Sequence, residues 1–334
     1  MPMKSQIKDL KEILNSPKKI VITTHKGADG DAIGSSLAIY HLLKELGHQA
    51  HVITPDDYAY FLKWLPGTKN VIAYDDNKEK AEEITKESDL IFMMDLNQAN
   101  RLSNYANIVT SSNSKKILID HHEDPDLNIA DIIFSDKKSS STAELVFEII
   151  EKIGEKGLLN KNIAECLYVG IMTDTGSFKY PSTTSRTHDI ISALIQLGAE
   201  NAKIHDLIYD NTSSARIALL GYCLNKKLLL YPENNAAIIS LNAKELKEFN
   251  FQKGDTEGFV NYCLSIKNIK FAAFITEKEG IVKLSLRSKG NIKVNEIAKK
   301  YFNGGGHINA AGGISKVSVN ETIKELENII NNLK

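Results

Sequence analysis

Imidazole and carboxylate side chains gather directly behind the first apolar run of the chain. His25, Asp29 and Asp31 fall within seven residues in HKGADGD, immediately after KIVITT. One histidine with two aspartates suits Mn²⁺, Mg²⁺ or Zn²⁺. Two other interpretations compete, namely that the aspartates only cap a helix or that the glycines form a phosphate loop. The spacing fails GxGxxG and carboxylates repel phosphate, so the sequence favours a metal site.

Three further signals follow other apolar segments. Asp95 ends LIFMMD, Asp120-His121-His122 follows KILI, and Asp174 lies in TDTGSF after an apolar helix. Each signal alone is compatible with a turn or capping residue. Adjacent histidines diverge, so one can bind metal while the other faces substrate. Taken jointly, the signals predict one metal site built from these segments, and they leave open which of the two histidines binds metal.

The elements that must position these residues alternate between strands and helices. Strands are expected at Lys19–Thr24, Gln49–Thr54, Leu90–Leu96 and Lys116–Asp120, and helices at Asp31–Leu46, from Ser141 to Ile153, and at Ile163–Met172. Such alternation predicts an α/β fold, with a parallel sheet covered by helices on both faces. Open sheets of this type bind ligands at the carboxyl ends of their strands, where all the signals fall.

The pattern of expected helices and strands changes in the second half of the chain. Thr184–Ile208 reads as a helical connector, and the polar stretch Tyr209–Ser214 marks a boundary. Beyond it, strands are expected at Ala236–Leu241, Ile269–Thr276 and Ile281–Arg287, with a hairpin turn at Glu279-Gly280, and helices at Val294–Tyr301 and Val319–Leu333. We therefore expect a first domain at 1–195, a helical linker at 196–212, and a smaller mixed-sheet α+β domain at 213–334, with a catalytic cleft between the domains.

A glycine-rich segment in this second domain is the fifth signal. Gly304, Gly305 and Gly306 precede His307, and AAGG follows shortly after. Bare backbone N–H groups of this kind bind anions. The competing interpretation is a flexible linker, which would not normally contain a histidine. Upstream, Arg287 and Ser288 end a predicted strand, and the arginine suits a phosphate.

Charge and composition restrict the class of partner. The 334 residues include 41 Lys and Arg against 42 Asp and Glu, a net charge of −1. Proteins that grip long nucleic acid usually show a basic excess, so a long duplex is disfavoured and a short anionic substrate remains. The three cysteines are scattered, as in a reducing cytosol. No apolar run is long enough for a membrane span, and a cytoplasmic location is expected.

The ordered motifs make the resemblance specific. HKGADGDAIGS, Asp95, DHH, TDTGSF and GGGHINAAG together resemble the DHH phosphoesterase family with a C-terminal DHH-associated domain, over nearly the whole chain. Within that family the chain is most similar to the stand-alone nanoRNases, which degrade short oligoribonucleotides and dephosphorylate pAp. One departure is Ala28, where many relatives have proline, and it removes no ligand.

The resemblance implies a role for each site residue. His25, Asp29 and Asp95 would hold one divalent metal, and Asp31, Asp95, His121 and Asp174 a second, with Asp95 bridging. Asp120 and His122 would act in catalysis, His122 by stabilising or protonating the leaving group. Substrate would be held by Arg287, Ser288, Gly304, Gly305, Gly306 and His307. Mn²⁺ is the expected metal, with Mg²⁺ as the alternative, and a homodimer is the family expectation.

Other functions stay open at this stage. The nearest rival is hydrolysis of cyclic dinucleotides or of their linear dinucleotide products. A pyrophosphatase of the same superfamily is disfavoured, because GGGH is typical of the DHH-associated C-terminal domain and not of the C-terminal domain of those pyrophosphatases. A nucleotide-binding regulator without catalysis is the alternative of a different class, since a fold alone does not prove activity.

Overall fold

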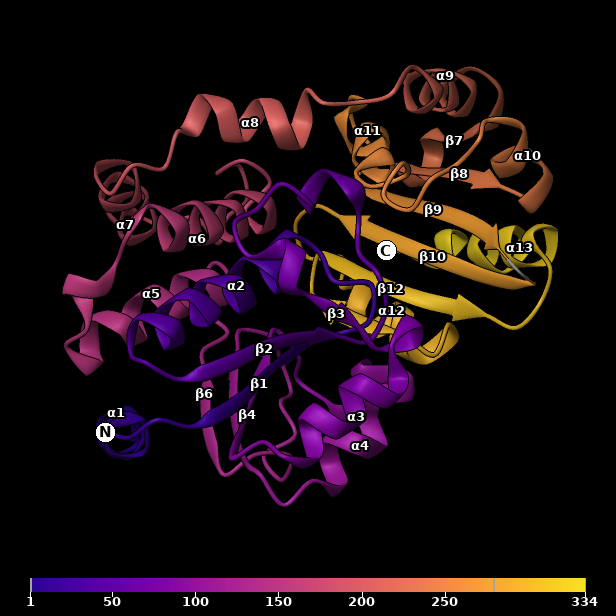
Figure 1. Cartoon of the computed structure of the whole chain (residues 1–334). Helices are drawn as coiled ribbons and strands as arrows, with labels where there is room; N and C mark the ends of the chain where they lie inside the picture. Colours follow the sequence, from indigo (N-terminus) through magenta and orange to yellow (C-terminus); the bar gives the residue numbers. More distant parts are fainter. Residues whose placement is uncertain (1, 279, 334) are drawn as a thin grey trace. The chain divides into compact units, whose positions relative to one another are not determined.

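The computed structural model describes residues 2–278 and 280–333, so Glu279 of the expected hairpin turn lies outside the described residues. The chain divides into two compact units, Met1–Asn211 and Thr212–Lys334 (Figure 1). Each unit has its own six-stranded sheet and its own hydrophobic cores. This is the α/β unit followed by a mixed-sheet unit that the sequence predicts.

All strands of the first sheet run parallel, in the order β3-β2-β1-β4-β5-β6. Their bounds are β1 (Lys19–Thr24), β2 (Gln49–Thr54), β3 (Ile72–Ala73), β4 (Leu90–Met94), β5 (Lys115–Asp120) and β6 (Ile132–Ser135). The order of the strands reverses between β1 and β4. In doubly wound sheets, ligands bind outside the carboxyl ends of the strands at this switch point.

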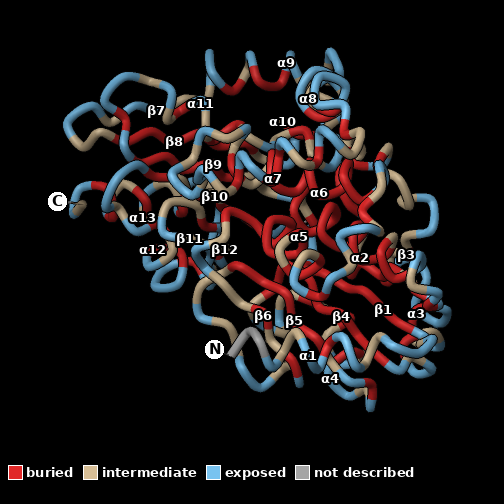
Figure 2. Tube along the Cα trace, turned by 90° about the vertical axis from the view of Figure 1, so that its left-hand side faces the viewer, coloured by how far each residue is buried: buried red, intermediate tan, exposed pale blue. Residues whose placement is uncertain are grey.

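Helices cover both faces of this sheet. The helices of the unit are α1 (Pro2–Leu14), α2 (Gly30–Glu45), α3 (Lys78–Lys86), α4 (Ala106–Ser111), α5 (Thr142–Ile153), α6 (Lys161–Asp174), α7 (Ser185–Gln196) and α8 (Asn201–Tyr209), with a 3₁₀ segment η4 (Ala99–Tyr105). Of these, α7 and α8 pack against α6. Alternate residues of β1 serve the two faces, because Ile20 and Ile22 join one core and Val21 the other. Burial on both faces explains the unbroken apolar runs, seen as buried strands in Figure 2.

Close packing of α2 against α6 brings two distant segments to the same edge of the sheet. A Cβ on Gly34 of α2 would lie 2.4 Å from the carbonyl oxygen of Cys166 in α6, so only glycine permits this approach. Gly30 is as restricted, since a Cβ there would lie 2.3 Å from Thr173 Oγ1. The glycines of the first motif therefore hold Asp31 beside the end of α6.

Two element ends differ from the sequence prediction in ways that matter for the site. The fourth strand ends at Met94 rather than Leu96, because Asp95 has a left-handed φ of 57° and leaves the strand direction. The expected helix Ile163–Met172 extends to Asp174, so that aspartate occupies the last helical turn rather than the turn that follows. Strand β6 was not predicted, since its four residues lie within a polar stretch.

The segment Thr184–Ile208 forms two helices rather than one. They separate at Leu197–Glu200, where Gly198 has a φ of 103°. Ile204 and Ile208 of α8 are buried in the core of the first unit. Only Asp210 and Asn211 follow α8 before the second unit begins.

The second sheet is mixed, in the order β11-β12-β10-β9-β8-β7, with β8 and β9 parallel and the other pairs antiparallel. Its strands are β7 (Leu228–Tyr231), β8 (Ala236–Leu241), β9 (Phe271–Lys278), β10 (Ile281–Ser288), β11 (Gly305–His307) and β12 (Ala310–Ser315). Its helices are α9 (Ser214–Tyr222), α10 (Ala243–Glu248), α11 (Phe259–Ser265), α12 (Val294–Tyr301) and α13 (Val319–Asn331).

The glycine-rich segment of this unit is neither a free loop nor a linker. Gly305–His307 pairs with Ala310–Gly312 as a short antiparallel hairpin, and β12 continues the sheet beside β10. The backbone of the motif is therefore fixed by the sheet. In the described part of the chain, no helix is long and apolar enough to cross a membrane.

Candidate functional site

His25 directly follows β1, at the switch point of the first sheet. Its Nδ1 lies 3.0 Å from the carbonyl oxygen of Lys26, which can only accept, so Nδ1 carries the proton. Its Nε2 lies 3.4 Å from Asp95 Oδ2 and has no hydrogen-bond partner among the residues that the structure describes. The side chain is buried. An imidazole fixed by Nδ1, with Nε2 turned to a carboxylate, fits a metal ligand.

Asp29 has two roles that the sequence presents as alternatives. Its Oδ1 accepts hydrogen bonds of 3.1 Å from the backbone N–H groups of Asp31 and Ala32, so it caps α2. Its carboxylate also lies within 4.8 Å of the donor atoms of His25 and Asp95. Asp29 can therefore cap α2 and be a candidate metal ligand at the same time.

Asp31 is buried in the first turn of α2 and reaches across to the start of α5. Its Oδ2 accepts from Thr142 N at 2.6 Å, and its Oδ1 accepts from Ala143 N at 2.8 Å. Gly170 makes room for this carboxylate, because a Cβ there would lie 2.9 Å from Asp31 Oδ1. Asp31 Oδ2 lies 3.8 Å from His121 Nε2.

Asp95 is the common member of the cluster. Each group of three potential ligands found within the described part of the first unit contains it. Its Oδ1 lies 3.7 Å from His121 Nε2, whereas its other oxygen, Oδ2, is the one near His25. Its left-handed φ is unfavourable for a residue with a side chain and is tolerated best by aspartate and asparagine. Such backbone strain is typical of functional sites.

His121 shows the same arrangement as His25. Its Nδ1 lies 3.3 Å from the carbonyl oxygen of Ser139, and its Nε2 lies 3.4 Å from Asp174 Oδ2. Both histidines thus have Nδ1 fixed on the backbone and Nε2 turned toward carboxylates. His25 lies beside Asp29 and Asp95, and His121 lies beside Asp31, Asp95 and Asp174. That these six residues bind metal stays a prediction.

Asp120 and His122 form a separate pair beside this cluster. His122 Nδ1 lies 2.8 Å from Asp120 Oδ1, and His122 Nε2 lies 3.2 Å from Arg101 Nη1. A guanidinium only donates, so Nε2 accepts and Nδ1 donates to Asp120. Arg101 Nη1 is also 3.3 Å from the carbonyl oxygen of Asp95. Sequence reasoning missed Arg101, whose only signal is a lone cation six residues after Asp95.

Burial and crowding change the acidity of the carboxylates. Burial, followed by the charges of Asp95 and Asp174, raises the pKa of Asp31 well above its usual value. Burial also raises the pKa of Asp174, to about 6. For Asp95, burial acts in the same direction, but the imidazoles of His122, His25 and His121 outweigh it and lower its pKa. The pKa values of neighbouring carboxylates are therefore shifted in opposite directions. Bound cations would stabilise the charged form of all of them.

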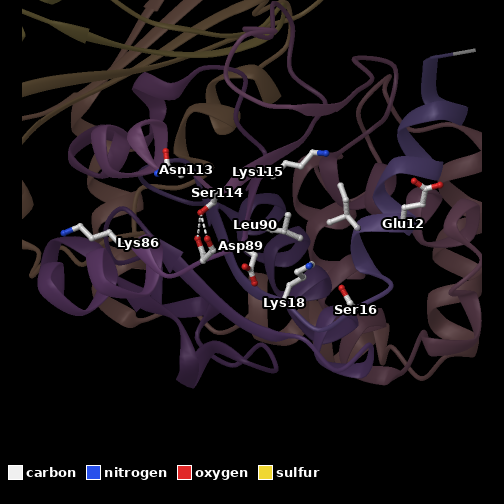
Figure 3. A pocket seen from close by; sticks show the side chains of 11 residues that line it. Glu12, Ser16, Lys18, Lys86, Asp89, Leu90, Asn113, Ser114 and Lys115 are labelled. Carbon is white, nitrogen blue, oxygen red and sulfur yellow. Dashed lines mark hydrogen bonds between the residues drawn. The ribbon is translucent and has the colours of Figure 1, made fainter.

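A hollow of about 510 Å³ opens at the opposite edge of the same sheet (Figure 3). Lys18 precedes β1, Leu90 begins β4 and Lys115 begins β5, so the hollow lies at the amino ends of the strands. Its charged lining includes both signs, with Glu12 and Asp89 beside the lysines. It is separate from the cluster around Asp95.

Two of the predicted substrate-binding residues share one face of the second sheet. Arg287 of β10 is paired with Ala310 of β12, and Ala310 is paired in turn with His307 of β11. Residues directly opposite each other point to the same face. Arg287 and His307 therefore flank the small side chain of Ala310 on this face, and both are suited to anions.

The three consecutive glycines are constrained to different degrees. A Cβ on Gly304 would lie 1.9 Å from the carbonyl oxygen of Gly312, and Gly306 has a φ of 137°. Gly305 has neither restriction, because nothing in the described residues lies within 4 Å of the position of its Cβ. Ser288 differs from all of these, since it is buried and its hydroxyl is 2.5 Å from Ile292 O and 2.8 Å from Asn309 Nδ2.

The two units carry opposite charge. In the sequence, Thr212–Lys334 contains 18 Lys and Arg against 11 Asp and Glu, whereas Met1–Asn211 contains 23 against 31. The overall charge of −1 therefore conceals an acidic first unit and a basic second unit. The basic excess lies in the unit of Arg287 and His307 and favours anion binding there.

Two parts of the chain match models of known protein families. Residues 19–171 match the model of the DHH family, N-terminal domain, and residues 234–332 match the DHHA1 domain. The chain belongs to the DHH family. The DHH family match contains five of the six predicted metal ligands, and the DHHA1 match contains Arg287 and the glycine hairpin.

Individual members of the DHH family cover most of the chain. The bifunctional oligoribonuclease and PAP phosphatase NrnA of Bacillus subtilis is 28% identical, over 88% of this chain and 88% of that protein. The cyclic-di-AMP phosphodiesterase GdpP of the same organism is 27% identical, over 96% of this chain but 49% of that protein. The crystal structure of an exopolyphosphatase-related protein from Bacteroides fragilis superposes with a TM-score of 0.93, at 40% identity, covering 98% of this chain and 96% of that one.

Proposed function

We propose that this chain is a two-metal phosphohydrolase that degrades short oligoribonucleotides to mononucleotides and dephosphorylates pAp to AMP. The observation that carries the proposal is the arrangement around Asp95. Two histidines turn Nε2 toward carboxylates there, and the buried Nε2 of His25 has no hydrogen-bond partner among the described residues. The NrnA relative supports the substrate class.

The donor set fits divalent cations. His25, Asp29 and Asp95 would hold one ion, and Asp31, Asp95, His121 and Asp174 a second. Two such ions supply charge neutralisation on the phosphoryl group and an activated water for in-line hydrolysis. Four carboxylates with two imidazoles favour Mn²⁺, and Mg²⁺ shares the same kinds of ligand.

Residues beside the ligands would orient the substrate. Asp120 fixes the tautomer and the ring of His122, which holds the guanidinium of Arg101. Because His122 Nε2 accepts from Arg101, a proton for the leaving group would require this hydrogen bond to break first. We propose instead that Arg101 donates to a phosphoryl oxygen as charge develops there, and that Asp120 and His122 position it.

The second unit would bind the remainder of the substrate. Its basic excess and the Arg287–Ala310–His307 row suit a second phosphate or a terminal nucleotide. The open position beside Gly305 leaves backbone N–H groups accessible to such a ligand.

Hydrolysis assays test the proposal directly. The purified full chain with Mn²⁺ should release mononucleotides from RNA of two to five nucleotides and phosphate from pAp, and EDTA should abolish both reactions. Intact RNA, pAp and dinucleotides after incubation with Mn²⁺ or Mg²⁺ would contradict the hydrolase and favour a nucleotide-binding regulator.

A second function is favoured by a specific comparison. The GdpP relative matches almost the whole chain, so hydrolysis of cyclic di-AMP or of its linear product pApA is the alternative. Rates on short RNA, pAp, pApA and cyclic di-AMP should be compared in one experiment. The proposed function requires the first two to exceed the rate on cyclic di-AMP.

A further inference from the structure

The segment that opens α5 contacts three of the proposed metal ligands. The carbonyl oxygen of Ser139 accepts from His121, and the backbone N–H groups of Thr142 and Ala143 donate to Asp31. The hydroxyl of Thr142 donates to Asp95 Oδ1 at 2.8 Å. In the sequence this segment indicates only a helix start. In the structure it supports ligands from β5, α2 and the end of β4.

Thr142 is the residue of this segment that joins two ligands. Its N–H binds Asp31 at 2.6 Å, and its hydroxyl binds Asp95, so one residue contacts both carboxylates. Its side chain is fully buried. Both carboxylates are thereby held at a spacing that the rigid start of a helix determines.

The helix itself does not need this hydroxyl. Ser141 is the N-cap of α5, and its Oγ accepts from the N–H of Glu144 at 3.0 Å. Thr142 is the first residue of α5, so no helical carbonyl lies one turn before it to accept from its hydroxyl. The hydroxyl of Thr142 bonds instead to a carboxylate 47 residues away in the sequence.

We infer that Thr142 is a positioning residue of the metal centre, which fixes Asp31 and Asp95 relative to each other. The inference rests on the proposed metal site. With Oδ1 of Asp95 bound by the hydroxyl, the carboxylate cannot rotate freely, and Oδ2 remains directed toward His25. Such support of a ligand by a neighbouring group typically changes metal affinity by about 10- to 100-fold.

Calorimetric titration of the metal-free full chain with Mn²⁺ tests this role. Thr142→Val removes the hydroxyl at nearly the same volume and should weaken Mn²⁺ binding by about tenfold or more. Thr142→Ser keeps the hydroxyl and should bind Mn²⁺ within about twofold of wild type. If Thr142→Val does not fold, Thr142→Ala replaces it, because the smaller side chain cannot overpack the site. Thr142→Ala should also weaken Mn²⁺ binding by about tenfold or more.

Thr85→Val is the matched control. Thr85 is also a fully buried threonine of the first unit, but it lies on α3 and bonds to Ala81 and Tyr105. This variant should lose thermal stability and keep its Mn²⁺ affinity. Wild-type affinity in Thr142→Val and Thr142→Ala would overturn the role of Thr142 alone, whereas a wild-type chain that binds no Mn²⁺ would overturn the proposed function and this inference together.

Discussion

Under the proposed function, the two units would hold a phosphorylated ligand in opposite ways. In the first unit, four aspartates and two histidines converge from a sheet edge in an acidic domain, and they can contact an anion only through cations. In the second unit, a basic domain presents Arg287, His307 and a bare backbone directly. The proposed function therefore assigns the chemistry to the acidic unit and the recognition of substrate to the basic unit.

This contrast explains why the overall charge is a poor guide. The net charge of −1 argues against long nucleic acid, and it does so by averaging an acidic unit with a basic one. A local excess of 18 cations over 11 anions in the second unit is compatible with short anionic substrates. Charge counted by domain, rather than by chain, would have shown this from the sequence.

Removal of the shared carboxylate should have the largest effect. Asp95→Ala deletes the one group common to every ligand triad within the described first unit. We expect the loss of kcat to be on the order of 10³-fold, the scale of removing preorganised charge from a transition state. Asp89→Asn, at the other end of β4, is the control and should retain activity. Full activity in Asp95→Ala would mean that the cluster around Asp95 is not the catalytic site.

Arg101 tests whether the acidic unit also supplies a cation. Arg101→Lys keeps the charge but cannot maintain the contacts with both His122 and the Asp95 carbonyl. We expect kcat to fall by roughly 10- to 100-fold with KM nearly unchanged, because the contact would strengthen in the transition state. Steady-state kinetics on pAp measure both constants. A rise in KM alone would assign Arg101 to ground-state binding.

Arg287 tests the recognition side. Arg287→Ala should raise KM by about tenfold, the worth of one charge-assisted hydrogen bond, and leave kcat much less affected. Lys283→Ala is matched to it, since Lys283 lies four residues earlier on β10 and faces the same side of the sheet. Equal effects of the two variants would reduce the role of Arg287 to that of general positive charge.

The glycine hairpin gives the smallest and most local test. Gly304→Ala forces a Cβ against the backbone of β12 and should destabilise the protein by roughly 1–3 kcal/mol. Gly305→Ala meets no atom, so the melting temperature should hold while KM rises several-fold. Thermal unfolding and kinetics separate the two variants. A KM unchanged in Gly305→Ala would mean that substrate does not approach this backbone.

The sequence predicted elements of both units, and Ala236–Leu241 and Val294–Tyr301 of the second unit have their predicted bounds. The candidate ligands of the first unit stand out in the sequence because they follow apolar runs, and strand ends of a parallel sheet meet at one edge. Their binding of metal stays a prediction. Burial on both faces made those runs conspicuous, so Lys19–Thr24 and Gln49–Thr54 were predicted with their observed bounds. In the second unit, the hairpin at Gly305–His307 was not predicted, because three glycines carry no apolar alternation.

Contacts between residues that are far apart in the sequence could not be predicted. Thr142 lies 47 residues from Asp95 and 111 from Asp31, and only the fold brings them together. Arg101 is close to Asp95 in sequence, yet its orientation depends on His122, 21 residues later. The left-handed backbone of Asp95 is likewise imposed by its surroundings, since nothing in MMDLN requires it.

Anomalous diffraction from crystals grown with Mn²⁺ tests the central claim most directly. We expect two manganese peaks in the first unit, one bound by His25 and Asp29, the other by Asp31, His121 and Asp174, with Asp95 bound to both. A single peak, or peaks that do not contact Asp95, would contradict the bridged two-metal site.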